Sequence, residues 1–270
     1  MMRRCPNLNS DASPAVQSLS GTTKSVDVGT DTSAFSVAFE GGAVHTDQGL
    51  ASYTSPRSTA LSVTPTVKDD GSVELNVVRT SASAPMTSSF AFALAAGQKL
   101  SVDANGAVDV VDADDSYAGG TATPDAVDAS GKVVPVTYAI NGSTVTQTLT
   151  PDADTTFPVV SPMWLGFSTI SKVKWVHVSK WSPTAAVYPT WWGRHTGAAA
   201  RWSAWGEAKK KGGSGMNHAT METQFMCHFD AVRIYAPNKP SWDLDSKRPN
   251  TSEYNEIKHK CNYPDAGSEW

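Results

Sequence analysis

The chain has 270 residues, of which 40% are hydrophobic and 18% are charged, a composition that fits a folded protein and excludes a wholly disordered one. Its formal charge of −4 is divided unevenly, because residues 1–160 carry 8 Lys and Arg against 17 Asp and Glu, whereas residues 161–270 carry 14 against 9. No stretch approaches the roughly 18 consecutive apolar residues that a membrane span needs, and the modest cation excess of the second half does not favour nucleic-acid binding.

This change of composition indicates two domains that meet near the stretch FPVVSPMW. We expect a flexible, Ser/Thr/Asp-rich arm over residues 1–34, an acidic β-rich domain over 35–160 and a basic, Trp-rich α+β domain over 161–270. Their opposite charges would allow the acidic domain to dock on the basic one. The first residues, MMRR, are typical of the start of a signal peptide, but no apolar segment follows, so the export route and the role of Cys5 stay open.

Alternating apolar residues around tight-turn dipeptides predict three β-hairpins in the acidic domain. Each dipeptide accepts the positive φ angles of a two-residue turn, and the three are Asp70-Gly71, Asn105-Gly106 and Asn141-Gly142. Residues 88–94, SSFAFAL, predict a further strand with its Phe side chains on one face. The domain is therefore expected to be all-β.

The basic domain is expected to contain a short antiparallel sheet and two helices. Residues 172–178, KVKWVHV, and residues 184–189, TAAVYP, predict two strands. Residues 197–211 predict a helix that Thr196 caps. A second helix is expected to start near Thr220, because apolar residues recur after it at spacings of three and four.

An ordered series of motifs extends over residues 172–264 and consists of YPTWWGR, AWGEA, QFMCHF, WDLD with a later KRP, and KCNYP. The series resembles an actinobacterial family of secreted proteins catalogued only as domain-of-unknown-function family 2599. Ser246-Lys247 departs from the family pattern, which has Pro-Trp there, and this removes one aromatic residue from any surface at that point. The resemblance implies a secreted product and supplies no known reaction.

Residues 125–160 resemble the acidic β-rich leader domain that precedes several unrelated small C-terminal domains in actinobacterial secreted proteins. That leader usually ends in a stretch like Pro-Val-Val-Ala-Asp-Pro, and residues 158–162 read PVVSP here. One leader joined to varied cargo is the arrangement expected of exported effectors or toxins, an analogy that carries no chemistry of its own.

In a secreted domain, the two late cysteines, Cys227 and Cys261, are expected to form one disulfide. A catalytic Cys227 would need to be an exposed, activated thiolate, whereas this residue lies beside Phe225 and Phe229 on the predicted helix. Zinc would need three or four converging ligands. The available histidines have no recognised ligand spacing: His195, His218, His228 and His259. We therefore expect neither a metal nor another cofactor.

His228 is the main candidate for general acid–base catalysis. Glu207 or Asp243 could orient its ring, and Arg194 or Arg248 could hold an anionic group of a substrate, as hydrolysis or group transfer requires. The same residues could instead form a buried polar network in which the arginines pair with the carboxylates and His228 belongs to the core. Both interpretations remain open at this point.

The tryptophans suggest a binding surface as well as a core. Four of them have the spacing of core residues: Trp175, Trp181, Trp202 and Trp205. Trp191 and Trp192 are expected in a turn with at least one ring exposed. Together with Arg194 and Arg248 they form a candidate surface for a glycan or a peptide.

Three functions are compatible with these interpretations. The first is a secreted, bacteriocin-like or effector protein that acts at the envelope of competing bacteria, released by cleavage near residues 157–164. The second is a non-catalytic cell-wall or glycan-binding module that uses Trp191, Trp192 and Arg194. The third is a hydrolase centred on His228. Whether the chain is an enzyme, its target and its oligomeric state do not follow from the sequence.

Overall fold

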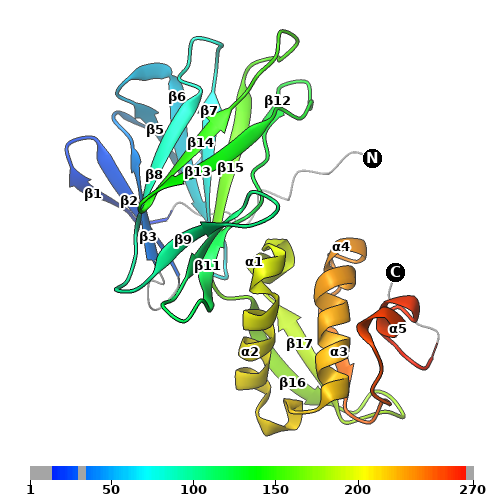
Figure 1. Cartoon of the computed structure of the whole chain (residues 1–270). Coiled ribbons are helices and arrows are strands. Elements are labelled where there is room, and N and C mark those ends of the chain that lie inside the picture. Colours follow the sequence, from blue (N-terminus) through cyan, green and yellow to red (C-terminus); the bar gives the residue numbers. More distant parts are fainter. Residues whose placement is uncertain (1–13, 30–34, 266–270) are drawn as a thin grey trace. The chain divides into compact units, whose positions relative to one another are not determined.

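The chain forms two units, Met1–Phe167 and Ser168–Trp270, in a computed structural model that describes residues 14–29 and 35–265 (Figure 1). Unit 1 is all-β, and unit 2 combines a short antiparallel sheet with helices and one disulfide, so the predicted fold class is confirmed. None of the helices in the described residues is long and apolar enough to cross a membrane. Cys5 lies outside the described residues.

The described strands of unit 1 form two sheets that share one hydrophobic core. The six-stranded sheet has the order β1-β2-β3-β8-β14-β13 and contains β1 (Val16–Ser20), β2 (Thr23–Val28), β3 (Phe35–Glu40), β8 (Thr87–Ala93), β13 (Val136–Asn141) and β14 (Thr144–Leu149). The nine-stranded sheet has the order β4-β5-β6-β7-β15-β11-β10-β9, with β12 beside β15, and contains β4 (Val44–Asp47), β5 (Leu50–Ser55), β6 (Ser58–Val67), β7 (Val73–Arg79), β9 (Lys99–Val102), β10 (Val108–Val111), β11 (Tyr117–Thr121), β12 (Val127–Asp128) and β15 (Val159–Gly166). Alternate side chains of both sheets therefore point into the common core.

The three predicted hairpins are confirmed. The antiparallel pairs are β6 with β7, β9 with β10 and β13 with β14, and the glycine of each turn dipeptide has a positive φ of 78°, 82° or 59°. Strand β8 buries Phe90 and Phe92 on one face, as the alternation predicted. The flexible arm expected over residues 1–34 is corrected for residues 16–28, where β1 and β2 pair with each other and β2 pairs with β3. Residues 1–13 and 30–34 lie outside the described residues.

The boundary between the units lies seven residues later than the composition suggested. Strand β15 continues to Gly166 and lies between β7 and β11 in the nine-stranded sheet, so residues 161–166 belong to unit 1. This placement argues against release by cleavage near residues 157–164. Cutting there would remove a strand that is hydrogen-bonded along its length to β7, with seven paired residues from Val159 to Leu165.

In unit 2, helices cover one face of a three-stranded antiparallel sheet (Figure 1). The sheet has the order β16-β17-β18, with β16 (Ile170–Val176), β17 (Thr184–Pro189) and β18 (Trp242–Asp245). The helical segments are α1 (Trp191–His195), η2 (Ala198–Ala200), α2 (Arg201–Gly212), η3 (Ser214–Met216), α3 (Ala219–Cys227), η4 (His228–Val232), α4 (Arg233–Tyr235) and α5 (Glu253–Lys258). Helix α2 packs on β16 and α3 packs on β18.

Side-chain caps mark the start of two helices in unit 2, α1 at Thr190 and α5 at Ser252. Thr190 caps α1 by accepting a hydrogen bond from the Gly193 N–H, and Thr196 follows α1 as its C-cap, so the predicted cap of α2 by Thr196 is wrong. The predicted second helix is confirmed as α3, and its buried face passes into η4, a single π-helical turn. Such turns widen a helix and redirect the side chains that follow.

Candidate functional site

His228 lies in the core of unit 2, only 1% exposed. Its Nδ1 donates a hydrogen bond to the Gln224 carbonyl oxygen at 2.8 Å, and its ring centroid lies 6.4 Å from that of Trp242. Its Nε2 has no hydrogen-bond partner among the described residues. Burial lowers the pKa of His228 to about 3, so the ring is neutral. A sealed, neutral imidazole has no route to a substrate in solution, and the placement argues against a hydrolase centred on His228.

Glu207 anchors the start of β16 to helix α2. Its carboxylate accepts hydrogen bonds from the Ser168 hydroxyl at 2.6 Å and from the Thr169 hydroxyl and N–H at 2.8 Å each. It also pairs with Lys211 at 2.7 Å. Burial alone would raise the pKa of Glu207, but the hydrogen bonds from Lys211, Ser168 and Thr169 outweigh it and hold the pKa below its ordinary value. With its oxygens engaged in this way, Glu207 is a structural residue.

The other two predicted catalytic residues, Asp243 and Arg194, form hydrogen bonds with nearby protein groups and do not approach His228 through any of them. Asp243 accepts a hydrogen bond from the Ser241 hydroxyl at 2.8 Å. Arg194 donates to the carbonyl oxygens of Pro237 at 3.1 Å and Pro240 at 3.3 Å, and burial lowers its pKa. Within the described residues, no hydrogen bond or ion pair joins His228, Glu207 and Asp243 to one another, so the structure does not assemble the predicted catalytic group.

Arg248 is a buried clamp rather than a binding residue, which corrects the sequence-based expectation. It is 8% exposed, its Nε donates to Asp245 at 2.8 Å and its Nη1 donates to the Asn262 carbonyl oxygen at 2.6 Å. Asp245 also accepts hydrogen bonds from Ser179 and Thr184. Arg248 thus fastens the segment after α5 to the end of β18.

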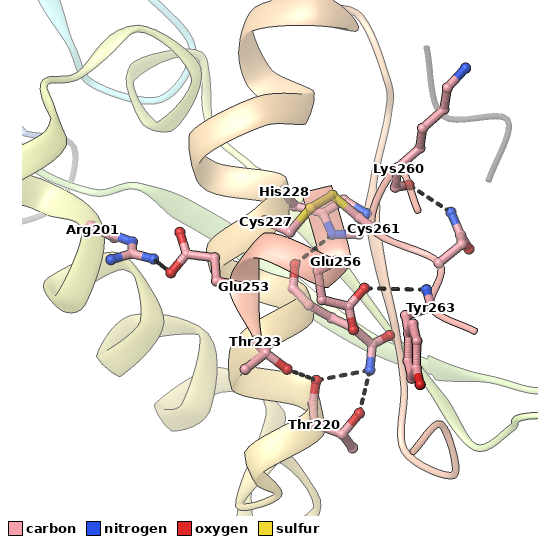
Figure 2. Close-up of a disulfide and its surroundings, with 12 residues drawn as sticks. Arg201, Thr220, Thr223, Cys227, His228, Glu253, Glu256, Lys260, Cys261 and Tyr263 are labelled. Atoms are coloured by element: carbon pink, nitrogen blue, oxygen red, sulfur yellow. Dashed lines mark hydrogen bonds and ion pairs between the residues drawn. A yellow bond between two sulfur atoms is a disulfide. The ribbon is translucent and has the colours of Figure 1, made fainter. Parts of the chain in front are cut away.

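The predicted disulfide is confirmed between Cys227, the last residue of α3, and Cys261, which follows α5 (Figure 2). The two Cα atoms are 5.6 Å apart, and both residues are buried. Figure 2 also shows Glu256 beneath this bridge, where its Oε2 accepts a hydrogen bond from the Tyr263 N–H at 3.4 Å. The segment after α5 is therefore attached to the rest of unit 2 at two points: the disulfide joins it to α3, and Arg248 joins it to the end of β18.

A second polar cluster joins three helical segments. Arg201 of α2 pairs with Asp230 of η4 at 3.0 Å and with Glu253 of α5 at 2.5 Å (Figure 2 shows the contact with Glu253). Burial and a hydrogen bond with Glu253 raise the pKa of Asp230 to about 6. Sequence reasoning missed this cluster, because no spacing rule pairs Arg201 with carboxylates that lie 29 and 52 positions further along the chain.

The tryptophans are distributed differently from the prediction. Trp192 is fully buried and cannot contact a ligand, and Trp191 is half-buried with its ring stacked on His195 at 3.9 Å between centroids. Trp205 is in the core, as predicted. In contrast, Trp175 is 39% exposed and Trp202 is 60% exposed, so the assignment of these two to the core is wrong.

Trp175 lines a shallow hollow of about 370 Å³ that is largely open to solvent. The hollow is built from the end of β16, the turn before β17, η3, the start of α3 and the residue after β18. Its lining residues are Trp175, Pro183, Gly215, His218 and Ser246. An apolar ring and a few polar groups thus meet in a concave part of unit 2.

Two contacts fix the Trp175 ring in place. Its Nε1–H donates to the Gly212 carbonyl oxygen at 2.9 Å, which uses the polar end of the indole. Its edge lies against Gly215, where a Cβ would come within 2.6 Å of the ring, so only glycine leaves room for the indole in this position. The ring is therefore oriented before any ligand arrives, and part of its surface faces solvent.

Two polar side chains flank the ring in the hollow. His218 precedes α3 as its N-cap residue, is exposed and gives no side-chain hydrogen bond to that helix. Ser246 is fixed by its backbone, whose N–H donates to the Pro183 carbonyl oxygen at 3.0 Å. These residues can hydrogen-bond a ligand stacked on Trp175. Over the described ranges, no group of three or more His, Cys, Asp or Glu is arranged to hold a metal ion.

Unit 2 contains a segment that is similar to known protein sequences. Residues 170–264 match the family described as "Protein of unknown function (DUF2599)", which confirms the resemblance of the C-terminal motifs. Uncharacterized proteins of Mycobacterium bovis and of two Mycobacterium tuberculosis strains are each 34% identical over 84 residues, 30% of this chain and 56% of each relative. The chain thus spans about half the length of the curated relatives it matches. No solved structure gives a significant match.

Proposed function

We propose that unit 2 is a non-catalytic, secreted module that binds a glycan of the cell envelope in the hollow beside Trp175. The observation that carries this proposal is the half-exposed indole, held by Gly212 and Gly215 next to two free polar side chains. A sugar ring has an apolar face of C–H groups that stacks on an aromatic ring, while its hydroxyls need hydrogen-bond partners at the edge. The hollow offers both kinds of contact.

Two further observations support binding over catalysis and an extracytoplasmic setting. The residues that a His228-centred hydrolase would need are buried or engaged: His228 is sealed in the core, and Glu207 holds Ser168 and Thr169. The buried disulfide is compatible with an oxidising compartment. No contact among the described residues specifically favours an effector that acts on competing bacteria.

The test is sedimentation of the full chain with purified bacterial cell walls, together with an assay for released sugar. We expect Trp175→Ala to weaken binding about tenfold, because loss of one stacked ring costs on the order of 1–3 kcal/mol. Trp202→Ala is the matched control, since it removes a more exposed tryptophan that does not line the hollow.

Equal binding by Trp175→Ala and the unchanged chain would contradict the proposed site. Release of soluble sugar by the unchanged chain would contradict the non-catalytic assignment. Circular dichroism of both variants checks that each keeps its fold.

A further inference from the structure

Both sheets of unit 1 line a small cavity. Its walls come from β3 and β8 of the six-stranded sheet and from β5 and β6 of the nine-stranded sheet. The cavity measures about 20 Å³, which is room for one occupant of the size of a water molecule. The apolar part of its lining consists of Phe39, Leu61, Val63 and Phe90.

Two buried hydroxyl groups also line this cavity, and each has a hydrogen atom left to donate. Ser88 is 7% exposed, and its Oγ accepts a hydrogen bond from Nη2 of Arg79 at 2.9 Å. Ser55 is 6% exposed, and its Oγ accepts from the N–H of Arg57 at 3.2 Å. Neither hydroxyl donates to another group within the residues that the structure describes. Both O–H groups are therefore available to an acceptor in the cavity.

The guanidinium behind Ser88 is a buried positive charge. Arg79 is 0% exposed, and although burial lowers its pKa to about 10, it is still charged at neutral pH. All the oxygens that accept its hydrogen bonds are neutral: the hydroxyls of Ser88 and Ser161 and the carbonyl oxygens of Pro85 and Met86. An anion close to such a charge offsets part of the cost of its burial.

The carboxylate in the lining does not cancel this charge. Glu40 is paired with Arg57, whose Nε and Nη2 lie 2.6 and 2.5 Å from its Oε2, so these two side chains together carry no net charge. Arg79 lies directly opposite Leu61, another lining residue, in the pairing of β7 with β6. Among the described residues around the cavity, the net charge is therefore that of Arg79.

We propose that this cavity in unit 1 binds a single monatomic anion, such as chloride, between the hydroxyls of Ser55 and Ser88. Both O–H groups donate to the ion, and Arg79 supplies the positive charge behind Ser88. A water molecule accepts the same two hydrogen bonds but brings no charge to balance the guanidinium, and phosphate or sulfate is too large for the volume. This site is independent of the glycan-binding function proposed for unit 2.

The first experiment measures the stability of unit 1 in the full chain by urea unfolding, followed by circular dichroism, in sodium chloride and in sodium gluconate. The two salts are used at equal ionic strength, so screening is the same, and gluconate is too large for the cavity. We expect the unfolding equilibrium constant of unit 1 to be about tenfold smaller in chloride, the effect of a ligand at roughly ten times its Kd. Ser55→Ala and Ser88→Ala should each remove most of this difference.

Ser25→Ala is the matched control, because Ser25 is a buried serine of β2 that does not line the cavity. Since Ser88→Ala also removes an acceptor from Arg79, the dependence on chloride is the readout rather than the stability itself. Crystals of the full chain soaked in sodium bromide give a direct check, with an anomalous peak expected between Ser55 and Ser88. Equal stability in both salts, a chloride effect of the same size in all three variants, or a cavity that holds only water in those crystals would overturn the proposal.

Discussion

Glu256 is a buried carboxyl group that forms no ion pair within the part of the chain that the structure describes. It is 0% exposed, its Oε1 has no hydrogen-bond partner, and burial raises its pKa to about 7. Because the folded chain keeps a proton that the unfolded chain releases, this group contributes most to stability at low pH. Its contribution is lost as the pH rises from the ordinary glutamate value of about 4.5 toward 7.

We therefore predict that Glu256→Gln stabilises unit 2 at pH 8 by at most about 3 kcal/mol and changes little at pH 5. The amide oxygen of glutamine can still accept the hydrogen bond from Tyr263. Urea unfolding at the two pH values measures the effect, with Glu40→Gln in unit 1 as the control for loss of a carboxylate. If the difference in unfolding free energy between Glu256→Gln and the unchanged chain is the same at both pH values, Glu256 is not the source of this pH dependence.

The residues of the candidate site illustrate where sequence reasoning stops. Alternation correctly placed Trp175 on a strand, but its exposure depends on β16 being the edge of the sheet and on Gly215 lying against the ring. The sequence predicts that Trp192 lies in a turn, but it lies in the five-residue helix α1, and its side chain is buried in the core. Both outcomes are set by tertiary neighbours that no local pattern specifies.

At the scale of elements, Glu207 joins helix α2 to the first strand of unit 2. We predict that Glu207→Gln lowers the free energy of unfolding of unit 2 by about 1–3 kcal/mol at pH 7, since the amide loses the ion pair with Lys211 and places a donor among the donors of Ser168 and Thr169. The pKa of Glu207 is held low, so its contribution is present above the ordinary glutamate value and is lost as the pH falls through the lowered pKa.

The measurement is urea unfolding at pH 7 and at pH 3. Glu222→Gln is the matched control, because it removes another carboxylate from a helix of unit 2 while its amide oxygen can still accept from the Trp205 indole. A penalty that does not diminish at pH 3, or one shared by the control, would contradict the anchoring role of the Glu207 carboxylate.

Elements with strong local signals were predicted, and those that depend on packing were not. The three hairpins follow from turn dipeptides that tolerate positive φ, and α3 follows from apolar residues at helical spacing. The π-helical turn η4 has no such signal, and α5 buries Glu256 while exposing Tyr254 and Ile257, the reverse of an amphipathic pattern. Helix α5 is held by its neighbours rather than by its own apolar face.

At the scale of the whole molecule, composition predicted two units because the net charge and the tryptophan content both change at the same place in the sequence. Moving the boundary from residue 160 to Phe167 alters neither half's charge, since residues 161–167 contain no charged side chain. Composition is therefore insensitive to where the last strand of unit 1 ends, and strand pairing decides it: β15 binds β7 from Val159 to Leu165. The same pairing ties the junction into unit 1.

The disulfide belongs to one unit only, and this predicts how the chain unfolds. Closing the loop between Cys227 and Cys261, which are 34 positions apart, stabilises unit 2 by about 3–4 kcal/mol in the chain-entropy account. Replacing both cysteines with alanine should therefore lower the urea midpoint of unit 2 and leave that of unit 1 unchanged. Eight of the 9 tryptophans lie in unit 2, so fluorescence reports mainly that unit.

Cys5→Ala is the control for loss of a sulfur atom, and far-ultraviolet circular dichroism follows the β-rich unit 1 in the same titration. The urea midpoints from fluorescence and from circular dichroism should lie further apart in the double variant than in the unchanged chain, because only unit 2 has lost its crosslink. A parallel shift of both transitions would mean that the two units unfold as one cooperative body, and the stability of unit 2 would then depend on unit 1.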